Sequence, residues 1–494
     1  MIALTDLIYF INFIMLKKLY ILALFLTFIF SDIYDGYVLF TPSLDHSLDE
    51  SIEHTTFLMD NDENIINSWV HDCKPSSISY LMPDSSLVYP CKETPFEPLN
   101  GDNGPMGGRV VKYSWQGDIL WDFNVATSYM QPHHDIEVLD NGNILMLVFE
   151  KVSADEARAL GMESINSSLD FIIPCKVIEV VPNGIDEEEI IWEWRFWDHL
   201  VQDVDPDKPN YGLISEHPER LDINVRPPTS SYGDWIHTNA IDFNEELDLI
   251  VISSRRTGEV YIIDHSTSTL DASSSSGGNY GMGGDFLYRW GKPSNYNSGN
   301  GENDFLLNPH GVNWINSNYP GGGNILVYNN RNFNTGSVVY EINLYLDNEN
   351  QFLLNNDGFF DPKVPIWEYE IQGVFSMTQS GAYRLENGNT FITVSEAVHM
   401  REVDTDGGMV WSYEYAGPNV SIPRAQKLGL DYFYQPLTGD INSDSMVNIQ
   451  DVIIVVGIVL DQQPSEELLS VSDLNSDGLV DILDVIVLVN IILS

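Results

Sequence analysis

The chain has 494 residues, with 73 acidic and 23 basic side chains and a formal net charge of −50 at pH 7. A surface this acidic repels nucleic acid and anionic lipid, so neither is expected as a partner. The length is sufficient for several domains or for one large repeat architecture.

The first 31 residues are typical of an export leader or signal peptide. Lys17 and Lys18 precede an apolar run over residues 19–30, which is the order of a positive n-region and a short h-region. The run is shorter than the roughly 20 residues that a membrane span needs, and no later segment is apolar enough to cross a bilayer. We therefore expect an exported protein, periplasmic or extracellular. No A-x-A site follows the run, so a cleaved leader and an uncleaved anchor are both compatible with the sequence.

The chain has three cysteines. Cys73 and Cys91 bracket a predicted hairpin over residues 76–90, so a disulfide between them is geometrically reasonable. Cys175 would then be left over. The spacings of these residues suit no zinc site.

Two strand patterns alternate from about residue 57 to residue 436. The first is a strand, a turn rich in Asn, Asp and Gly, and an apolar strand; its copies begin at residues 77, 133, 237, 310 and 380. The second is an apolar strand, a turn, and a strand that usually ends near Trp; its copies begin at residues 57, 110, 177, 260, 338 and 400. Paired hairpins of this kind are typical of the four-stranded blades of a β-propeller. A helix is indicated only over residues 154–162.

The unpaired copy of the second pattern, at residues 57–70, lies at the N-terminal end. A ring closes if strands from about residues 424–435 complete the blade that the N-terminus begins, which removes the exposed edges. The sequence therefore predicts an all-β, six-bladed β-propeller over residues 32–436.

Polar residues recur where the first pattern begins. Relative to the hairpin turn, Ser77, His134 and Ser380 are equivalent, and His237 and His310 open the third and fourth copies. The inner strands of a propeller line its channel, so these side chains are expected to converge at one mouth.

A predicted hairpin over residues 234–256 adds further polar groups to this mouth. It places Arg255 at the same end as His237 and Asn239, because its strands are antiparallel. A histidine, an amide and an arginine together suit an oxyanion. A solvated strand end is the alternative interpretation.

Residues 437–494 contain a duplicated calcium loop. Oxygen ligands at alternate positions, including a backbone carbonyl at the seventh, wrap a hard cation. Each loop is followed by an apolar, helix-like run, at residues 452–460 and 485–493. We therefore expect a small α-helical module with two structural Ca²⁺ sites; two acidic turns without an ion are the alternative. The expected ligands are Asp440, Asn442, Asp444, Met446, Asn448 and Asp451 in the first loop, and Asp473, Asn475, Asp477, Leu479, Asp481 and Asp484 in the second.

Several motifs resemble those of the aryl-sulfate sulfotransferases, a family of bacterial exported six-bladed propellers. They are HHDIEVLDNGN, DWIHTNAIDFNEELDLIVISSRR, PHGVNWI with GGGNILVYNN, and SGAYRLENGNT. The resemblance implies transfer of a sulfuryl group from a phenolic sulfate ester to a phenol, by a ping-pong route through a sulfated histidine. It implies neither a nucleotide sulfate donor nor a catalytic cofactor.

The resemblance also assigns roles to individual residues. His310 in PHGVNWI matches the nucleophile. Three residues match those that hold the sulfuryl oxygens: His237, Asn239 and Arg255. His134, or its neighbour His133, matches the histidine that the preceding repeat contributes. This sequence departs from the family's QHD motif, because it has PHG around the nucleophile.

The C-terminal loops resemble a type I dockerin, which implies a protein partner or a surface anchor. The module lacks a Ser-Thr pair before position 12, having Ile449–Gln450 and Ile482–Leu483 instead. Two other functions are compatible with the same residues. One is a non-catalytic propeller that binds a sulfated or carboxylated glycan or a phenolic ligand; the other is a structural scaffold displayed through the tail.

Overall fold

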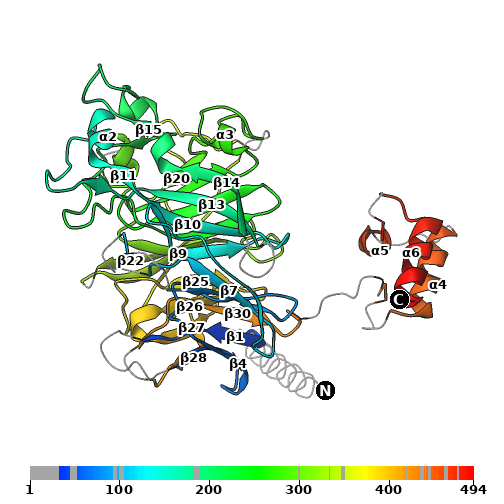
Figure 1. The fold of residues 1–494 in the computed structure, drawn as a ribbon. Helices are drawn as coiled ribbons and strands as arrows, with labels where there is room; N and C mark the ends of the chain where they lie inside the picture. The colour runs from blue at the N-terminus through cyan, green and yellow to red at the C-terminus, as the bar shows by residue number, and fades with distance from the viewer. Residues whose placement is uncertain are drawn as a thin grey trace, which may run out of the picture. The chain divides into compact units, whose positions relative to one another are not determined.

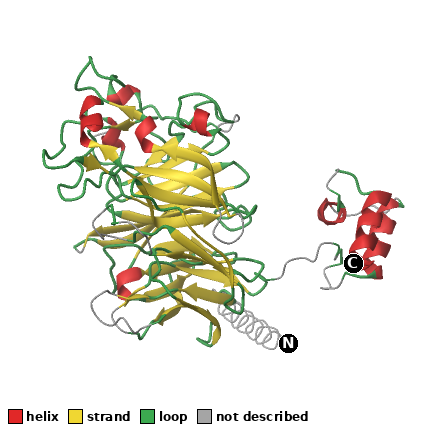
Figure 2. Cartoon of the chain, in the orientation of Figure 1, coloured by secondary structure: helices red, strands yellow, loops and turns green. Residues whose placement is uncertain are grey.

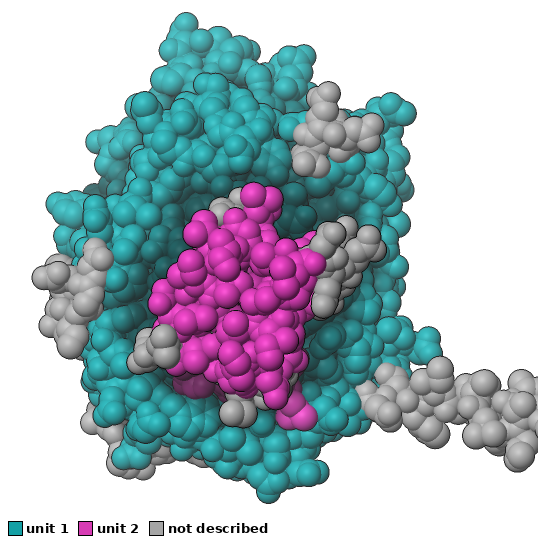
Figure 3. All heavy atoms as spheres, turned by 90° about the vertical axis from the view of Figure 1, so that its right-hand side faces the viewer, with its two compact units in different colours: residues 1–82, 86–429 teal, residues 83–85, 430–494 magenta. Residues whose placement is uncertain are grey.

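The computed structural model describes residues 33–44, 53–92, 97–99, 105–182, 188–298, 301–332, 334–346, 351–417, 420–433, 439, 441–442, 447–460, 466–475 and 478–493. The leader expected over residues 1–31 lies outside these residues. The chain divides into two compact units, residues 1–82 with 86–429 and residues 83–85 with 430–494, which Figure 3 colours separately. Each unit is described by itself.

The large unit contains six four-stranded antiparallel sheets (Figures 1 and 2). Sheet by sheet from the channel outward, the strands are β30 (Ala425–Gly429), β1 (Gly36–Phe40), β3 (His54–Asp60) and β4 (Ile65–His71); β5 (Tyr80–Leu81), β6 (Leu87–Cys91), β7 (Arg109–Tyr113) and β8 (Ile119–Asn124); β9 (Met130–Val138), β10 (Ile144–Glu150), β13 (Cys175–Pro182) and β14 (Glu188–Arg195); β17 (Thr238–Asn244), β18 (Leu249–Ser254), β19 (Glu259–Asp264) and β20 (Tyr288–Trp290); β21 (Pro309–Trp314), β22 (Ile325–Asn332), β23 (Gly336–Ile342) and β24 (Trp367–Glu370); β25 (Gly381–Arg384), β26 (Thr390–Val394), β27 (His399–Val403) and β28 (Met409–Glu414). The predicted six-bladed propeller is confirmed.

The two ends of the propeller share one blade. β30 pairs antiparallel with β1, from Gly36 opposite Gly429 to Phe40 opposite Ala425. The C-terminal strand is therefore the innermost strand of the blade that the N-terminal strands begin, as the count of sequence patterns predicted. This pairing closes the ring and leaves no open edge where its ends meet.

The second strand of each blade explains why the sheets stack into a ring. β10 and β26 are buried at every position, and so is β18. Both faces of such a strand meet apolar neighbours, so its sequence is a continuous apolar run rather than an alternating one.

Short elements occupy the connections between the strands of the blades. The predicted helix is present as α2 (Ala154–Ala159), where the Ser153 hydroxyl accepts a hydrogen bond from the Glu156 N–H and caps the first turn. The remaining short elements are β2 (Ser43–Leu44), β11 (Val152–Ser153), β12 (Phe171–Ile172), η1 (Phe196–Asp198), β15 (Leu200–Val201), η2 (Ile214–Glu216), β16 (Leu221–Asp222), α3 (Thr269–Ala272), η3 (Pro293–Tyr296), η4 (Ser395–Ala397) and β29 (Val420–Ser421).

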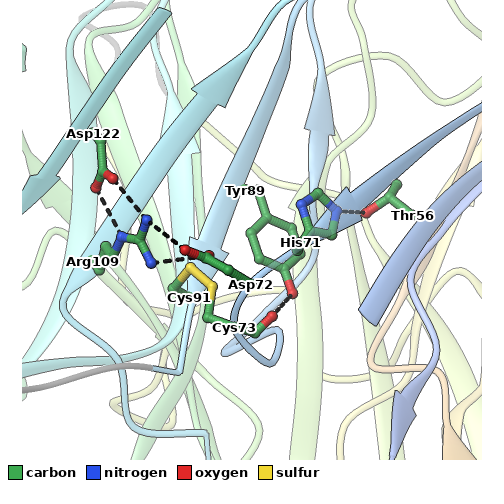
Figure 4. The surroundings of a disulfide bond; sticks show 8 residues. All are labelled: Thr56, His71, Asp72, Cys73, Tyr89, Cys91, Arg109 and Asp122. Atoms are coloured by element: carbon green, nitrogen blue, oxygen red, sulfur yellow. Dashed lines mark hydrogen bonds and ion pairs between the residues drawn. A yellow bond between two sulfur atoms is a disulfide. The ribbon is translucent and has the colours of Figure 1, made fainter. Parts of the chain in front are cut away.

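Cys73 and Cys91 form a disulfide, with their Cα atoms 5.7 Å apart (Figure 4). The Tyr89 hydroxyl donates a hydrogen bond to the Cys73 carbonyl at 2.8 Å and fixes the same corner. Cys175 is a free, buried thiol, as the pairing of the other two requires.

The small unit is helical. Its helices are α4 (Ile449–Val459), α5 (Glu466–Ser472) and α6 (Ile482–Leu493), and the two apolar runs of the sequence are α4 and α6. Val455 and Leu488, one from each of these helices, are fully buried in a shared core. Among the described residues, no helix combines the length and hydropathy needed to cross a membrane.

Candidate active site

A pocket lies where the innermost strands of the six blades begin. It is lined by Ser77, Ile78, His134, Asn239, His310, Gln379, Ser380, Pro423 and Arg424. Four of these residues are equivalent in the blades. Counted along the chain, each lies the same number of residues before the paired residue that adjoins the turn of its hairpin; they are Ser77, His134, His310 and Ser380. Arg424 precedes β30 directly, so every blade contributes a residue and only the closed ring assembles the pocket.

Backbone irregularities aim the polar side chains of three inner strands. The pairing register shifts at the start of β9, β17 and β21, where the sequence-predicted site residues lie. His134 and His237 have positive φ values of 60° and 58°, which few residues with a side chain adopt. Bulges of this kind commonly re-aim side chains next to active sites.

His310 is buried, and its ring is held in one tautomer. The Asn330 side-chain amide donates hydrogen bonds to the carbonyls of Ser376 and Gln379 at 3.0 and 3.1 Å, so its oxygen must face the ring. That oxygen lies 2.7 Å from His310 Nδ1, which therefore carries the proton and donates it. Nε2 keeps its lone pair and has no hydrogen-bond partner among the residues described.

The electrostatic surroundings keep the His310 ring neutral. Burial, with the positive charge of Arg255 as the second cause, lowers the pKa of His310 to about 3. The imidazole is therefore unprotonated at Nε2 throughout the physiological pH range, which a nitrogen nucleophile requires.

Gly311 explains why this chain has PHG where the resembling family has QHD. Its φ is +57°, and a Cβ at this position would lie 2.6 Å from the Ser380 carbonyl oxygen. The position is closed to an acidic side chain. The partner of the His310 ring is the amide of Asn330 instead.

His237 is paired with a carboxylate. Its Nδ1 lies 2.7 Å from Asp234 Oδ2, and both side chains are buried. Its ring stands edge-on to that of His134, with ring centroids 4.6 Å apart. A carboxylate on Nδ1 orients the ring and stabilises the imidazolium that forms when Nε2 takes up a proton. His237 thus has the partners of a proton-transfer residue.

His133 and His134 share one hydrogen bond, with their Nδ1 atoms 2.8 Å apart. One nitrogen must donate and the other accept. His133 Nε2 is buried without a partner, and its ring is stacked on Phe149. A buried lone pair is less unfavourable than a buried, unpaired N–H, so the proton of His133 is on Nδ1 rather than on Nε2. His133 Nδ1 therefore donates to His134 Nδ1, and His134 carries its own proton on Nε2. Because burial lowers the pKa of both rings, they are neutral.

Arg255 and Asn239 belong to the same hairpin, and of the two only Asn239 lines the pocket. The Arg255 backbone N–H donates to the His237 carbonyl at 3.0 Å, which fixes the two ends of the hairpin together. Its guanidinium has no carboxylate partner among the described residues, and its Nε is buried and unpaired. Asn239 accepts from the Ser253 hydroxyl at 2.6 Å and donates to the Pro309 carbonyl at 2.7 Å, which leaves one amide hydrogen available.

The family model for Arylsulfotransferase (ASST) matches residues 92–339. The chain belongs to the arylsulfotransferase family. The model for the Dockerin type I domain matches residues 438–493. The ASST match spans the strands that carry the His133–His134 pair, the His237 hairpin and His310.

Other comparisons add little to this assignment. No curated protein matches the chain. Among solved structures, a protein of unknown function from Bacteroides caccae is 11% identical over 80% of this chain and 99% of its own, with a TM-score of 0.43. A catalytically inactive virginiamycin B lyase from Staphylococcus aureus is 9% identical over 78% and 91%, with a TM-score of 0.34. Scores this low carry no weight for function.

The structure modifies the sequence interpretation of the third repeat. The pocket residue from β17 is Asn239, whereas His237 lies beside it against His134. Trp235, which precedes His237 in the same motif, is fully buried against Trp197. It belongs to the core.

Four polar groups of the site escaped the sequence analysis. Asn330 and Asp234 orient the rings of His310 and His237, and Arg424 forms a buried ion pair with Asp135 beside the pocket. Asn330 ends the quoted motif GGGNILVYNN and Asp234 begins the motif DWIHTN, so both were visible in the sequence, although neither pairing was.

The small unit contains two similar buried carboxylates, each of which accepts backbone hydrogen bonds from its own loop. Asp451 Oδ1 accepts hydrogen bonds from Ile441 N and Asn442 N at 2.8 and 3.2 Å. The equivalent oxygen of Asp484 accepts from Leu474 N and Asn475 N at the same distances. Both carboxylates are fully buried.

The chemistry of the tail fits a cation. Residues 437–494 contain no Lys, Arg or His that could neutralise the buried carboxylates. The expected ligands that lie in the described part of these loops are Asn442, Asn448, Asp451, Asp473, Asn475, Leu479, Asp481 and Asp484, and those outside it are Asp440, Asp444, Met446 and Asp477. Dockerin domains generally bind calcium, and buried, unneutralised carboxylates of this kind suit it.

Proposed function

We propose that the protein moves a sulfuryl group between phenols by a ping-pong mechanism in which His310 Nε2 is the nucleophile. Membership of the arylsulfotransferase family supports aryl sulfotransferase activity in general. The observation that carries the specific proposal is the neutral His310 ring, whose Nδ1 is bonded to Asn330 and whose Nε2 accepts no hydrogen bond from any described residue.

In the first half-reaction the His310 Nε2 lone pair attacks the sulfur of an aryl sulfate. The N–S bond forms as the bond between sulfur and the ester oxygen breaks, and the phenolate leaves with the electron pair. His237 donates a proton from Nε2 to this oxygen, with Asp234 stabilising the imidazolium beforehand. Asn330 accepts a hydrogen bond from the Nδ1–H of the ring as it becomes positively charged.

In the second half-reaction a phenol enters in place of the first. His237 removes its proton, the phenol oxygen attacks sulfur, and the N–S bond breaks. The electron pair returns to His310 Nε2, so the enzyme is regenerated without a redox step or a nucleotide donor.

Charge stabilisation is expected to supply much of the rate. As in phosphoryl transfer, the equatorial oxygens carry the charge, so donors and cations around them matter more than covalent chemistry. Arg255, His134 and Asn239 are the proposed N–H donors. Comparable donors in oxyanion sites are each worth roughly 3 to 4 kcal/mol.

Incubating the purified protein with 4-nitrophenyl sulfate and no acceptor tests the proposal. We expect stoichiometric nitrophenol release and one added sulfuryl mass on the intact chain, which a phenol acceptor then removes. If the ligand binds but the chain gains no mass and releases no nitrophenol, the propeller is a binding module for anionic phenolic or glycan ligands instead.

We propose that the tail holds one structural Ca²⁺ in each loop and that its helices depend on these ions. Metal binding contributes directly to folding in small modules whose site is not preformed in the unfolded chain. Chelation of the full-length protein is expected to make the segment after residue 436 cleavable, while the propeller stays intact. The protease should be one such as subtilisin, because the segment contains no Lys or Arg at which trypsin could cleave.

Variants separate the two calcium sites. Asp451→Ala and Asp484→Ala should each remove one ion, measured by elemental analysis of the desalted protein, whereas Asp406→Ala in a propeller turn should remove none. Equal protease resistance with and without chelator would contradict the proposal.

We propose residues 1–31 as leader, 32–436 as the transferase propeller and 437–494 as the dockerin-like module. Both families are typically extracellular or periplasmic, and a dockerin suggests a cohesin as protein partner. Phenolic sulfates and phenols are the small-molecule partners that the ASST family implies.

A further inference from the structure

One residue of the pocket carries a formal charge. Arg424 lines the pocket together with His134 and His310. Both histidines are neutral, because burial lowers their pKa values. Arg424 is therefore the only cation among the described residues that line the pocket. It lies outside the match to the family model, which ends at residue 339.

The Arg424 side chain joins two blades. It begins directly before β30 and forms a buried ion pair with Asp135 on β9, which belongs to a different blade. Gly381 leaves room for the side chain along this path, because a Cβ at that position would lie 2.3 Å from Arg424 Cδ. The ion pair and the close packing fix the guanidinium beside the pocket.

The carboxylate of Asp135 is fully engaged. Its Oδ1 accepts hydrogen bonds from the Ser77 and Tyr80 hydroxyls at 3.1 and 3.4 Å. Its Oδ2 accepts from the Ile241 N–H at 3.2 Å and from Arg424 Nη2. Four donors occupy the acceptor sites of a carboxylate. Asp135 does not itself line the pocket, so a molecule in the pocket meets the guanidinium and not the carboxylate.

Part of the Arg424 guanidinium is available to a ligand. Nη2 is bonded to Asp135, and no described residue accepts a hydrogen bond from Nε or Nη1. Burial raises the pKa of Glu137, and raises that of Asp242 to about 7, which reduces the negative charge of two further acids near the guanidinium. Buried polar groups are nearly always hydrogen-bonded, so the free N–H groups of this arginine favour an anion in the pocket.

We propose that Arg424 binds the sulfate group of the donor substrate through the N–H groups that Asp135 leaves free, and that Asp135 is the positioning residue of this guanidinium. The inference rests on the proposed function for the identity of the anion. An aryl sulfate that enters the pocket loses its water shell, and burying an anion is costly unless an opposite charge compensates. Arg424 supplies this charge where the other groups of the pocket are neutral.

Binding of two non-transferable analogues tests this role without requiring turnover. Benzenesulfonate is an anion, benzenesulfonamide has nearly the same shape and is uncharged at neutral pH, and the carbon–sulfur bond of both resists transfer. By calorimetry we expect Arg424→Gln to weaken the binding of benzenesulfonate at least about tenfold, as the loss of one charge-assisted hydrogen-bonded pair does. Its affinity for benzenesulfonamide should equal that of the wild type, whereas a merely structural role would weaken both analogues.

Two further variants serve as comparisons. Arg424→Lys keeps the charge but loses the planar fork, so a smaller loss of benzenesulfonate affinity is expected. Arg384→Gln is the matched control, because Arg384 is also a buried arginine paired with a carboxylate, that of Glu341 at 2.6 Å, and it does not line the pocket. It should leave both affinities unchanged.

A crystal structure of the wild type with benzenesulfonate decides the question even if Arg424→Gln does not fold. A sulfonate oxygen is expected within hydrogen-bonding distance of Arg424. A sulfonate bound away from Arg424, or failure of the wild type to bind benzenesulfonate, would overturn the inference.

The outcomes distinguish this inference from the proposed function. An unchanged benzenesulfonate affinity in Arg424→Gln, or an equal loss for both analogues, would overturn the role of Arg424 and leave the transfer through His310 standing. If the wild type binds benzenesulfonate through Arg424 but gains no sulfuryl mass from 4-nitrophenyl sulfate, the proposed transfer fails and the anion site stands.

Discussion

Replacing His310 with alanine is expected to lower kcat/KM for 4-nitrophenyl sulfate by about 10⁴-fold or more, as the loss of a covalent nucleophile does in other enzymes. The variant removes Nε2, the atom that is proposed to form the N–S bond. It should also fail to gain the sulfuryl mass during incubation with donor alone. Intact-mass spectrometry and nitrophenol release measure the two effects on the same sample.

A matched control separates this effect from the loss of any histidine. His217 is a partly exposed histidine paired with Glu219, and it does not line the pocket. His217→Ala should keep both the labelling and the rate. Full labelling of His310→Ala would show that the sulfuryl group is held elsewhere, and the mechanism would then have to be rebuilt around a different residue.

Replacing Arg255 with glutamine is expected to lower kcat by roughly 10²- to 10³-fold, the range observed when one preorganised donor to a developing charge is removed. The guanidinium lacks a carboxylate partner among the described residues, so its charge is available to the sulfuryl oxygens. Arg255→Lys keeps the charge but loses the planar fork, so an intermediate rate is expected. Steady-state kinetics with 4-nitrophenyl sulfate measure all three forms.

The expected loss should be mainly in kcat, because the oxygens become more negative in the transition state than in the bound donor. A variant that raised only KM would show that Arg255 binds the ground state uniformly. Arg158→Gln, which removes an exposed arginine of α2 that pairs with Asp155, is the control for a general loss of positive charge. If Arg255→Gln transferred at the wild-type rate, the oxyanion role would have to pass to Arg424 or another donor of the pocket.

Most of the fold was predictable because its signals are local. Each hairpin combines turn residues with an apolar strand, and the repetition of such hairpins fixes the architecture. The unequal numbers of the two patterns even indicated that the C-terminus closes the first blade, which the pairing of β30 with β1 bears out. Exact strand ends were less accessible, since they depend on bulges that no residue pattern marks.

The site was predictable only in part. The repeat register identified Ser77, His134, His310 and Ser380, which do line one pocket. It did not identify Asn239 as the pocket residue of the third repeat. The register of β17 shifts between Thr238 and Ala240, and a shift of this kind changes which side chain faces the pocket.

The sequence by itself determined the number of blades and the histidines available for chemistry, because each follows from local periodicity or short spacing. It made a Cys73–Cys91 disulfide reasonable, and the structure decided that it forms. Only the tertiary structure decided what those histidines can do. The Asn330 amide that sets the proton of His310 is buried in the adjacent strand, and the Asp234 carboxylate that orients His237 lies before the first strand of its blade. Tautomer, pKa and unpaired charge depend on groups distant in the chain, and these meet only when the ring of blades has closed.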